Sequence, residues 1–385
     1  MSVEAVNALT ARWAATATAT ATVAGEGGTV LSGAGAYPLL TLLAPYATGD
    51  ARAELAAVAS TPPPALDSAE VRLAVAAWIR DDLPLTDDWL ALPESLRGRL
   101  SGDPGVDQPV LDRWAAQNTA GLIERMPVAV TDETRMILAS ALSVVTTWRW
   151  PFTERPCRPA AGPWAGRELL GLDRGHYDPA LLRVVQTDAG TLTLLAVPGE
   201  EDVDVVLALG PADRPAAAVL PAAVGALPAL VPALPGGADV PVRPAAGGPG
   251  VTVRLIHAFD DRPQLDVSTV AFAVSGEHDL LAHAELFGLV AATDTGRGHF
   301  PGISPEPLAV SQAKQSATAL FGAVGFKAAA VTAMGMVRAG SIQQPSMQKE
   351  LTALTIDRPF GFLAVHRPTG AVLVAGWVTE PEPYR

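Results

Sequence analysis

Cysteine and histidine are the residue types in this chain best suited to covalent or metal chemistry, and both are sparse. The single cysteine, Cys157, lies between Arg155 and Arg158 in the segment ERPCRP. Two neighbouring cations would lower the pKa of a thiol and make it a nucleophile, although an inert thiol in a proline-rich surface turn has the same sequence. The six histidines are scattered: His176, His257, His278, His283, His299 and His366. One cysteine and no histidine pair on a shared helix face predict no metal site.

The usual catalytic motifs are missing from the sequence. It contains no phosphate-binding loop, no GxGxxG, no GxSxG and no HExxH, so the residues predict no catalytic group and no cofactor. The paired acids Asp260 and Asp261 are typical of a solvated turn. The formal net charge is -13, which repels phosphate backbones and disfavours nucleic acid as a partner. An apolar fraction of 49% is enough for a sizeable buried core.

The sequence leaves the compartment open. A single cysteine cannot form an internal disulfide, which fits a cytosolic protein or one secreted by a cell that avoids disulfides. The first residues, MSVEAVNALTARW, include an early Glu4 and do not form a secretory signal, so the chain is cytoplasmic or secreted with its leader removed. Residues 215–235 carry no charge but include several prolines. Because each proline costs about 3 kcal/mol inside a helix, we expect no membrane span there.

Helical and extended segments mix without regular alternation. The spacing of apolar residues predicts helices at residues 5–23, 34–59 and 279–290. The threonine-rich end of the first segment also fits a strand. We expect strands at 136–147, 190–198, 203–209, 250–259 and 268–274, and two more around the Arg-Pro-Thr-Gly turn near the C-terminus. Residues 136–147 are apolar almost throughout, as in a strand buried on both faces. Residues 211–249 are rich in proline, glycine and alanine and are expected to be irregular. With no linker visible, the chain is predicted to be one α+β domain, 1–385.

The segment from Ile356 to Pro381 resembles the C-terminal signature of the serpin family. The matching residues are Asp357, Arg358, Pro359, Phe360, Thr369, Gly370, Gly376, Val378 and Pro381. Four further blocks resemble serpin segments in the same order along the chain. They include Ser32, Ala47, Gly49 and Leu55 in the first, and Ala141, Trp148, Pro151 and Phe152 in the second.

The resemblance implies a serpin fold. Such a fold has a large central mixed sheet, smaller sheets, helices packed around them and an exposed reactive loop. Residues 138–147 and 306–325 should then be neighbouring central strands, and Trp148 should pack at the top of that sheet.

The segment after those strands resembles the serpin hinge, which begins at Gly325. The hinge residues are Gly325, Phe326, Ala328, Ala329, Ala330, Val331 and Thr332. Small residues suit a loop that must slide into the middle of a packed sheet. Family spacing places the scissile bond at Ala339–Gly340, with Arg338–Ala339 as the other candidate. The resemblance implies a protease as partner, with loop insertion after cleavage, and residues 333–345 are expected to be exposed and to be cut first by proteases.

Several departures from the family fall on this machinery. Phe326 replaces a small residue, so we expect it to obstruct insertion. Ala323 replaces a glutamate at the sheet top, and Gln315, with Gly35 and Ser140, replaces the polar cluster that lets the central strands part.

Three functions therefore stay open on the sequence alone. The first is inhibition of a serine (or cysteine) protease, and the second is a non-inhibitory binding or accessory role. The third is an enzyme on the same fold with Cys157 as its nucleophile.

Overall fold

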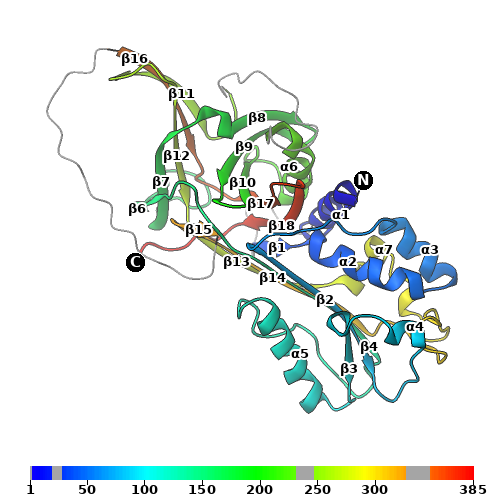
Figure 1. Ribbon diagram of the computed structural model, residues 1–385. Helices are drawn as coiled ribbons and strands as arrows, with labels where there is room; N and C mark the ends of the chain where they lie inside the picture. The colour runs from blue at the N-terminus through cyan, green and yellow to red at the C-terminus, as the bar shows by residue number, and fades with distance from the viewer. Residues whose placement is uncertain (1, 20–27, 231–246, 327–346) are drawn as a thin grey trace.

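Three β-sheets with helices packed against them make up the computed structural model (Figure 1). The structure describes residues 2–19, 28–230, 247–326 and 347–385. Strands and helices do not alternate regularly, so the α+β class predicted from the sequence is confirmed.

The largest sheet, called the central sheet here, brings together segments far apart in the chain. Its strands are β3 (Arg97–Leu100), β2 (Val71–Arg80), β4 (Met136–Val144), β5 (Thr146–Thr147), β15 (Gly325–Phe326), β14 (Gln312–Phe321) and β13 (Phe272–Asp279). β4 and β14 pair in parallel, so the prediction that these two segments are neighbouring central strands is confirmed. All residues of β4 are buried, as its unbroken apolar sequence predicted.

The other two sheets are antiparallel for the most part. One has the order β1 (Thr29–Leu31), β18 (Ala371–Val378), β17 (Phe360–His366), β10 (Val203–Leu209), β9 (Gly190–Pro198) and β8 (Leu182–Thr187). The other has the order β11 (Val251–Ala258), β16 (Met347–Thr355), β12 (Gln264–Val270), β7 (Leu169–Tyr177) and β6 (Thr153–Cys157). The two strands expected around the Arg-Pro-Thr-Gly turn are β17 and β18.

Helices cover both faces of the central sheet. The helices in the described part of the chain are α1 (Ser2–Ala17), α2 (Gly33–Leu43), α3 (Gly49–Val58), α4 (Asp87–Leu90), α5 (Pro104–Asn118), α6 (Ala216–Leu230) and α7 (Ala284–Phe287). α6 packs instead on β8, β9 and β17 of the six-stranded sheet. In Figure 1, α2, α3 and α7 lie on one side of β2 and β4, and α5 lies on the other. Leu111 of α5 packs with Ile137 of β4 in one core, while Leu40 of α2 and Leu138 of β4 belong to another. β4 is therefore covered from both sides, which explains its uniform hydrophobicity.

The expectation of an irregular segment at 211–249 is wrong for its first part, which forms α6. Pro221 and Pro228 lie inside this helix. Each removes a backbone hydrogen bond, but the helix buries Val219, Leu220 and Leu227 completely or almost completely. Burial of an apolar helix face outweighs intrinsic propensity here, as tertiary packing commonly does. In the described part of the chain, no helix is long and apolar enough to cross a membrane.

Other boundaries differ from the expected ones in detail. The helix expected at 279–290 shrinks to a 3₁₀ turn, Leu280–His283, followed by the short α7. β12 and β13 share the segment expected as one strand at 268–274.

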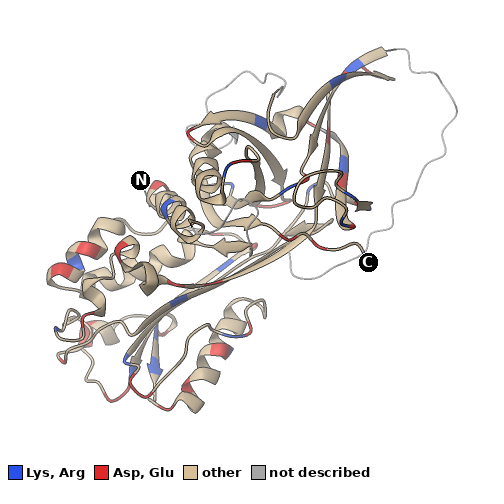
Figure 2. Ribbon diagram, turned by 180° about the vertical axis from the view of Figure 1, so that it is seen from behind, with Lys and Arg blue, Asp and Glu red and all other residues tan. Residues whose placement is uncertain are grey.

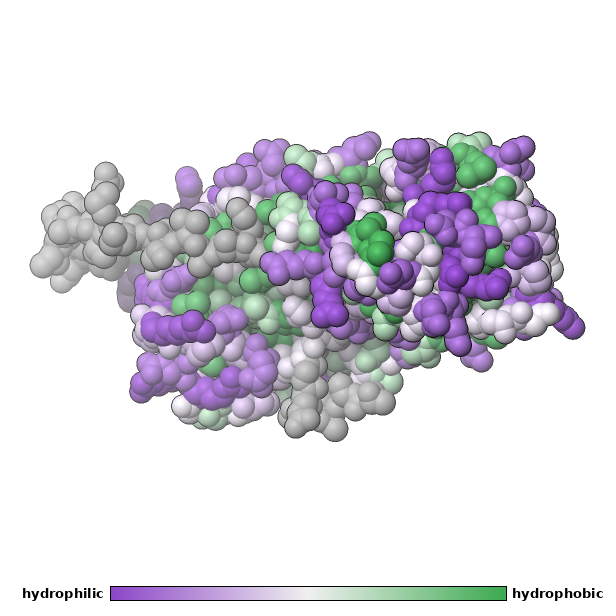
Figure 3. Space-filling view, turned by 90° about the horizontal axis from the view of Figure 1, so that it is seen from below, coloured by the Kyte–Doolittle hydropathy of each residue, from purple (hydrophilic) through white to green (hydrophobic). Residues whose placement is uncertain are grey.

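Charges are spread over the outside of the molecule. Figure 2 shows acidic side chains on α3 and α5, whereas the long strands carry few charges. Seen from below in Figure 3, the surface is mostly hydrophilic, with apolar side chains in small separate patches.

Candidate functional site at the top of the central sheet

The central sheet is divided at one end. β4 and β14 pair only between Ile137–Ala141 and Gln312–Ser316, and no further pairing between these two strands is present in the described part of the chain. After β14 the chain reverses direction, and β15 lies between β14 and β5. Phe326 pairs with Phe321 on one side and with Thr146 on the other. The first two residues of the predicted hinge therefore already form a short central strand.

Gly325 and Phe326 fit this position closely. A Cβ atom on Gly325 would lie 2.3 Å from the carbonyl oxygen of Thr146, so only glycine allows the strands to approach this closely. Phe326 is 1% exposed, and its ring centroid lies 6.1 Å from that of Phe362 in the neighbouring sheet. The core therefore contains a space for the ring in this state, and the expectation that Phe326 obstructs insertion of the loop stays a prediction.

Trp148 fixes the turn that leads into β15. Its indole Nε1 donates to the carbonyl of Gly322 at 2.8 Å, and its backbone N–H donates to the carbonyl of Val324 at 2.9 Å. The ring is almost fully buried and lies 4.9 Å from Phe321. The structure thus places Trp148 at the sheet top, in direct contact with the hinge turn.

Ala323 lies in the same turn and is held by backbone contacts. Its carbonyl accepts a hydrogen bond from the N–H of Phe152 at 2.7 Å, and its side chain is buried. A glutamate at this position would place a carboxylate in a mostly apolar environment. Where the family carries a glutamate, the turn is held here by backbone hydrogen bonds from Trp148 and Phe152.

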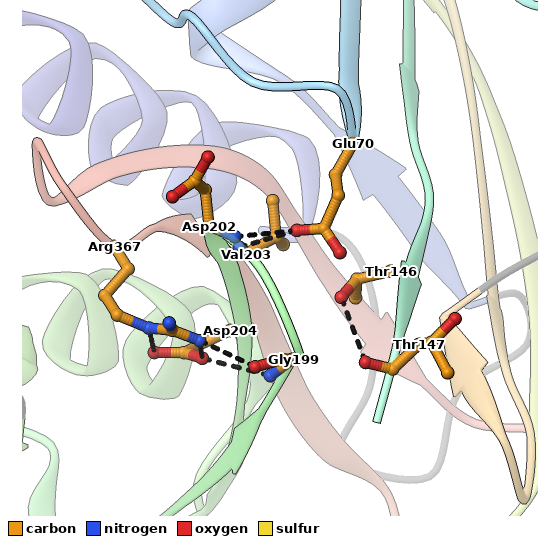
Figure 4. Close-up of polar contacts among 8 residues, drawn as sticks. All are labelled: Glu70, Thr146, Thr147, Gly199, Asp202, Val203, Asp204 and Arg367. Carbon is orange, nitrogen blue, oxygen red and sulfur yellow. Dashed lines mark hydrogen bonds and ion pairs between the residues drawn. The ribbon is translucent and has the colours of Figure 1, made fainter. Parts of the chain in front are cut away.

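A polar cluster beside β5 ties the central sheet to the β9–β10 turn (Figure 4). Arg367 forms a two-pronged ion pair with Asp204, at 2.5 and 2.9 Å, and also donates to the carbonyl of Gly199 at 2.9 Å. Glu70, just before β2, accepts from the N–H groups of Asp202 and Val203 at 3.0 and 2.9 Å. Glu70 therefore fastens the top of the central sheet to residues 202 and 203, while the Arg367–Asp204 pair fastens the β17–β18 turn to β10.

Electrostatics in this cluster follow from burial and hydrogen bonding. Burial raises the pKa of the Glu70 carboxyl, while hydrogen bonds from Thr146 and from the backbone of Val203 and Asp202 oppose the rise. Asp204 raises the pKa of Arg367, chiefly through their hydrogen bonds. No sequence pattern indicates this cluster, because its members come from four segments far apart in the chain.

Lower in the sheet, Gln315 forms a second polar contact. Its side-chain oxygen accepts from the N–H of Ser32 at 2.8 Å, and its Nε2 donates to the Ser32 carbonyl at 2.9 Å. A Cβ atom on Gly35 would lie 3.0 Å from that Nε2, so glycine leaves room for the long glutamine side chain. Ser140 stands opposite Gln315 on β4. The polar contacts under the sheet are thus rebuilt by Gln315 and Gly35, and the inference that they are lost as a set is wrong.

Replacing Gln315 by alanine is expected to lower the free energy of unfolding by about 2–4 kcal/mol, since a buried N–H loses its acceptor and a cavity forms. Gln312→Ala is the matched control: Gln312 makes the same pair of bonds, to Ala129, at an exposed site. Denaturant unfolding should show that the control loses less than about 1 kcal/mol of its free energy of unfolding. Equal losses in the two variants would contradict the structural role given to Gln315.

Cys157 does not lie in the environment that its sequence neighbours indicated. It ends β6, is half-buried, and burial, followed by the charges of Asp173 and Asp357, raises the pKa of its thiol. Arg155 and Arg158 are instead within ion-pair distance of Asp173 and Glu168, at 3.7 and 3.0 Å. Of the two alternatives that the sequence left open for Cys157, the raised pKa favours the inert thiol over the nucleophile. Among the described residues no group of three potential metal ligands comes together.

The remaining predicted site residues lie outside the described part of the chain. These are Ala328, Ala329, Ala330, Val331 and Thr332 of the hinge, and Arg338, Ala339 and Gly340 at the candidate scissile bonds. Their roles stay predictions.

Residues 255–381 match the family model described as Serpin (serine protease inhibitor). The fold resembles that of Serpin48 from the insect Tenebrio molitor, at 15% identity over 98% of this chain and 97% of that chain, with a TM-score of 0.71. Native protease nexin-1 with heparin is similar at 17% identity, covering 99% and 98%, with a TM-score of 0.71.

Thyroxine-binding globulin in complex with thyroxine is similar at 17% identity, covering 99% of each chain, with a TM-score of 0.70. No curated protein matches the sequence. The sequence match to the serpin family covers the C-terminal third of the chain, and nearly the whole chain has the serpin fold.

Proposed function

We propose that this protein inhibits a serine protease by presenting residues 327–346 as a substrate loop and inserting the cut loop into the central sheet. One observation carries the proposal: Phe326, the last described residue before the loop, is already seated as a central strand between β14 and β5. Insertion would then extend a strand that exists, rather than start a new one.

The register of β15 fixes where each further residue would go. With Phe326 opposite Phe321 and Thr146, the next residues would run antiparallel to both neighbours, so Ala330 would lie opposite Ala317 and Leu142. Because strand side chains alternate, Ala328, Ala330 and Thr332 would point to the same face as Phe326. Thr332 would arrive opposite Gln315 and Ser140, where the polar contacts under the sheet lie.

The chemistry would take place at Ala339–Gly340 or Arg338–Ala339. The serine oxygen of the protease attacks the carbonyl carbon, the peptide bond breaks, and the departing amine takes up a proton. The new N-terminal fragment is then joined to the protease by an ester. If insertion outpaces hydrolysis of that ester, the protease is carried away with the loop and stays trapped.

Mixing the protein with trypsin, elastase and subtilisin tests this function. The expected result is a complex that survives SDS with at least one of them, and mass spectrometry should place the cut after Arg338 for trypsin and after Ala339 for the other two. Arg338→Ala should slow trypsin by at least about 100-fold, because its binding pocket requires a basic side chain, and leave subtilisin nearly unaffected. Rapid cleavage with no stable complex would instead favour a non-inhibitory binding role.

A further inference from the structure

The five-stranded sheet ends in β11, whose outer edge faces away from the sheet. β11 pairs with β16 on one side, and no other strand in the described part of the chain pairs with it. Residues 252–255 are exposed in succession, so both faces of the strand are exposed as well as its edge. In Figure 1 the ends of β11 and β16 project from the body of the molecule.

The composition of β11 differs from that of a protected edge. Edge strands commonly carry charges or prolines that discourage pairing with another chain. The opposite edge of the same sheet follows this rule, because β6 contains Pro156 and the charged side chains of Glu154 and Arg155. β11 has the sequence VTVRLIHA, with one arginine and no proline. Its Val253 and Leu255 are 39% and 70% exposed and lie on the same face, since strand side chains alternate.

The hydrogen bonds to β16 show which backbone groups of β11 face outward. The N–H of Thr355 donates to the carbonyl of Gly250 at 2.9 Å, so every second residue from Gly250 onward faces β16. Val253, Leu255 and His257 therefore direct their N–H and C=O groups to the outer edge. These are the groups that a further strand would bind.

We infer that this edge pairs with the same edge of a second copy of the chain, forming an antiparallel dimer with twofold symmetry. The inference does not depend on the proposed function. Outward groups occur on every second residue, so two identical strands can pair only about a residue that lies opposite itself. The side chains and backbone groups of β11 decide which residue that is.

Two of the possible centres are unfavourable. A centre at Arg254 would set two guanidinium groups directly opposite each other, and like charges in that position destabilise a pair of strands. A centre at Val253 would need the N–H of Val251, which already donates to the carbonyl of Gly248 at 3.1 Å. A centre beyond residue 255 would shorten the pairing, because the strand ends soon after it.

The remaining centre is Leu255, and it suits every neighbouring position. Leu255 would exchange both backbone hydrogen bonds with its copy, and Val253 would do the same with His257 of the second copy. Arg254 would lie opposite Ile256, so no two like charges meet. The pairing would also bury the highly exposed side chain of Leu255 against its copy, which removes apolar surface from water.

Charge exchange at this centre tests the dimer in the intact protein. Sedimentation velocity should show the wild type dimerising at concentrations between about 1 and 100 µM. Leu255→Lys and Leu255→Glu should each weaken dimerisation at least about 100-fold, because like charges then face each other across the axis. An equimolar mixture of the two variants should recover at least about tenfold of that loss, since opposite charges then meet. Recovery also excludes misfolding as the cause of the loss.

Val106→Lys is the matched control. Val106 is 52% exposed on α5, and a charge there should leave dimerisation unchanged. A wild type that stays monomeric up to about 100 µM would overturn the inference and leave this edge to a strand of a different protein. A dimer that survives both substitutions at Leu255, or a mixture that shows no recovery, would overturn it as well.

Discussion

A single cut in the loop is expected to raise the melting temperature of this protein by at least about 10 °C. Residues 327–335 would continue the strand begun at Phe326, and successive residues would gain backbone partners alternately on β14 and on β4. A backbone hydrogen bond contributes about 1 kcal/mol net, and in a chain of 385 residues each kcal/mol moves the midpoint by about 1 °C.

The measurement is a thermal melt before and after limited cleavage with subtilisin, with the cut site confirmed by mass spectrometry. Ala330→Glu is the control. The extrapolated register places this side chain inside the sheet, where burying an unpaired carboxylate is costly. The variant should therefore be cut as fast as the wild type, but its melting temperature should rise little on cutting. If cut and intact wild type have the same melting temperature, the loop does not insert. The non-inhibitory binding or accessory role then becomes the better explanation of the function.

The family and the course of the chain could be read from the sequence because both depend on local patterns. The turn and strands between Phe360 and Val378 are fixed by residues close together in the chain, and the buried β4 is visible as an unbroken apolar run. The hinge assigned to the small residues after Phe326 rests on their resemblance to the family and on their place in the chain, and it stays a prediction. These features need no knowledge of what lies across the sheet.

The features that could not be predicted from the sequence each depend on a contact with a residue distant in the chain. Phe326 looks too large until Phe362 and the surrounding core are known, and Gln315 looks like a lost contact until Ser32 is placed beneath it. The two alternatives for Cys157 could not be separated from the sequence, because the aspartate of the adjacent strand that pairs with Arg155 was not known. α6 was missed because its packing outweighs its prolines. Single positions that break a family pattern are therefore weak grounds for inferring lost function.

Phe326 provides the second large expected effect. Phe326→Ala should lower the free energy of unfolding of the intact protein by about 3–5 kcal/mol, because it empties a fully buried site in the core. Phe259→Ala is the matched control, since that ring is 66% exposed and its loss should cost little. Urea unfolding of the three intact proteins measures both effects, and a loss below about 1 kcal/mol at Phe326 would show that its ring is not seated in the core.

The same variant distinguishes a seated Phe326 from an obstructing one. If the ring occupies one site before and after cleavage, its removal destabilises both forms equally, and the gain on cutting stays as in the wild type. If the ring instead blocks the sheet, Phe326→Thr should leave the intact protein nearly unchanged and enlarge the gain on cutting. The pairing of Phe326 with both Phe321 and Thr146 leads us to expect the first result. The buried ring then anchors the hinge, so that the small residues after it enter the sheet in a fixed register.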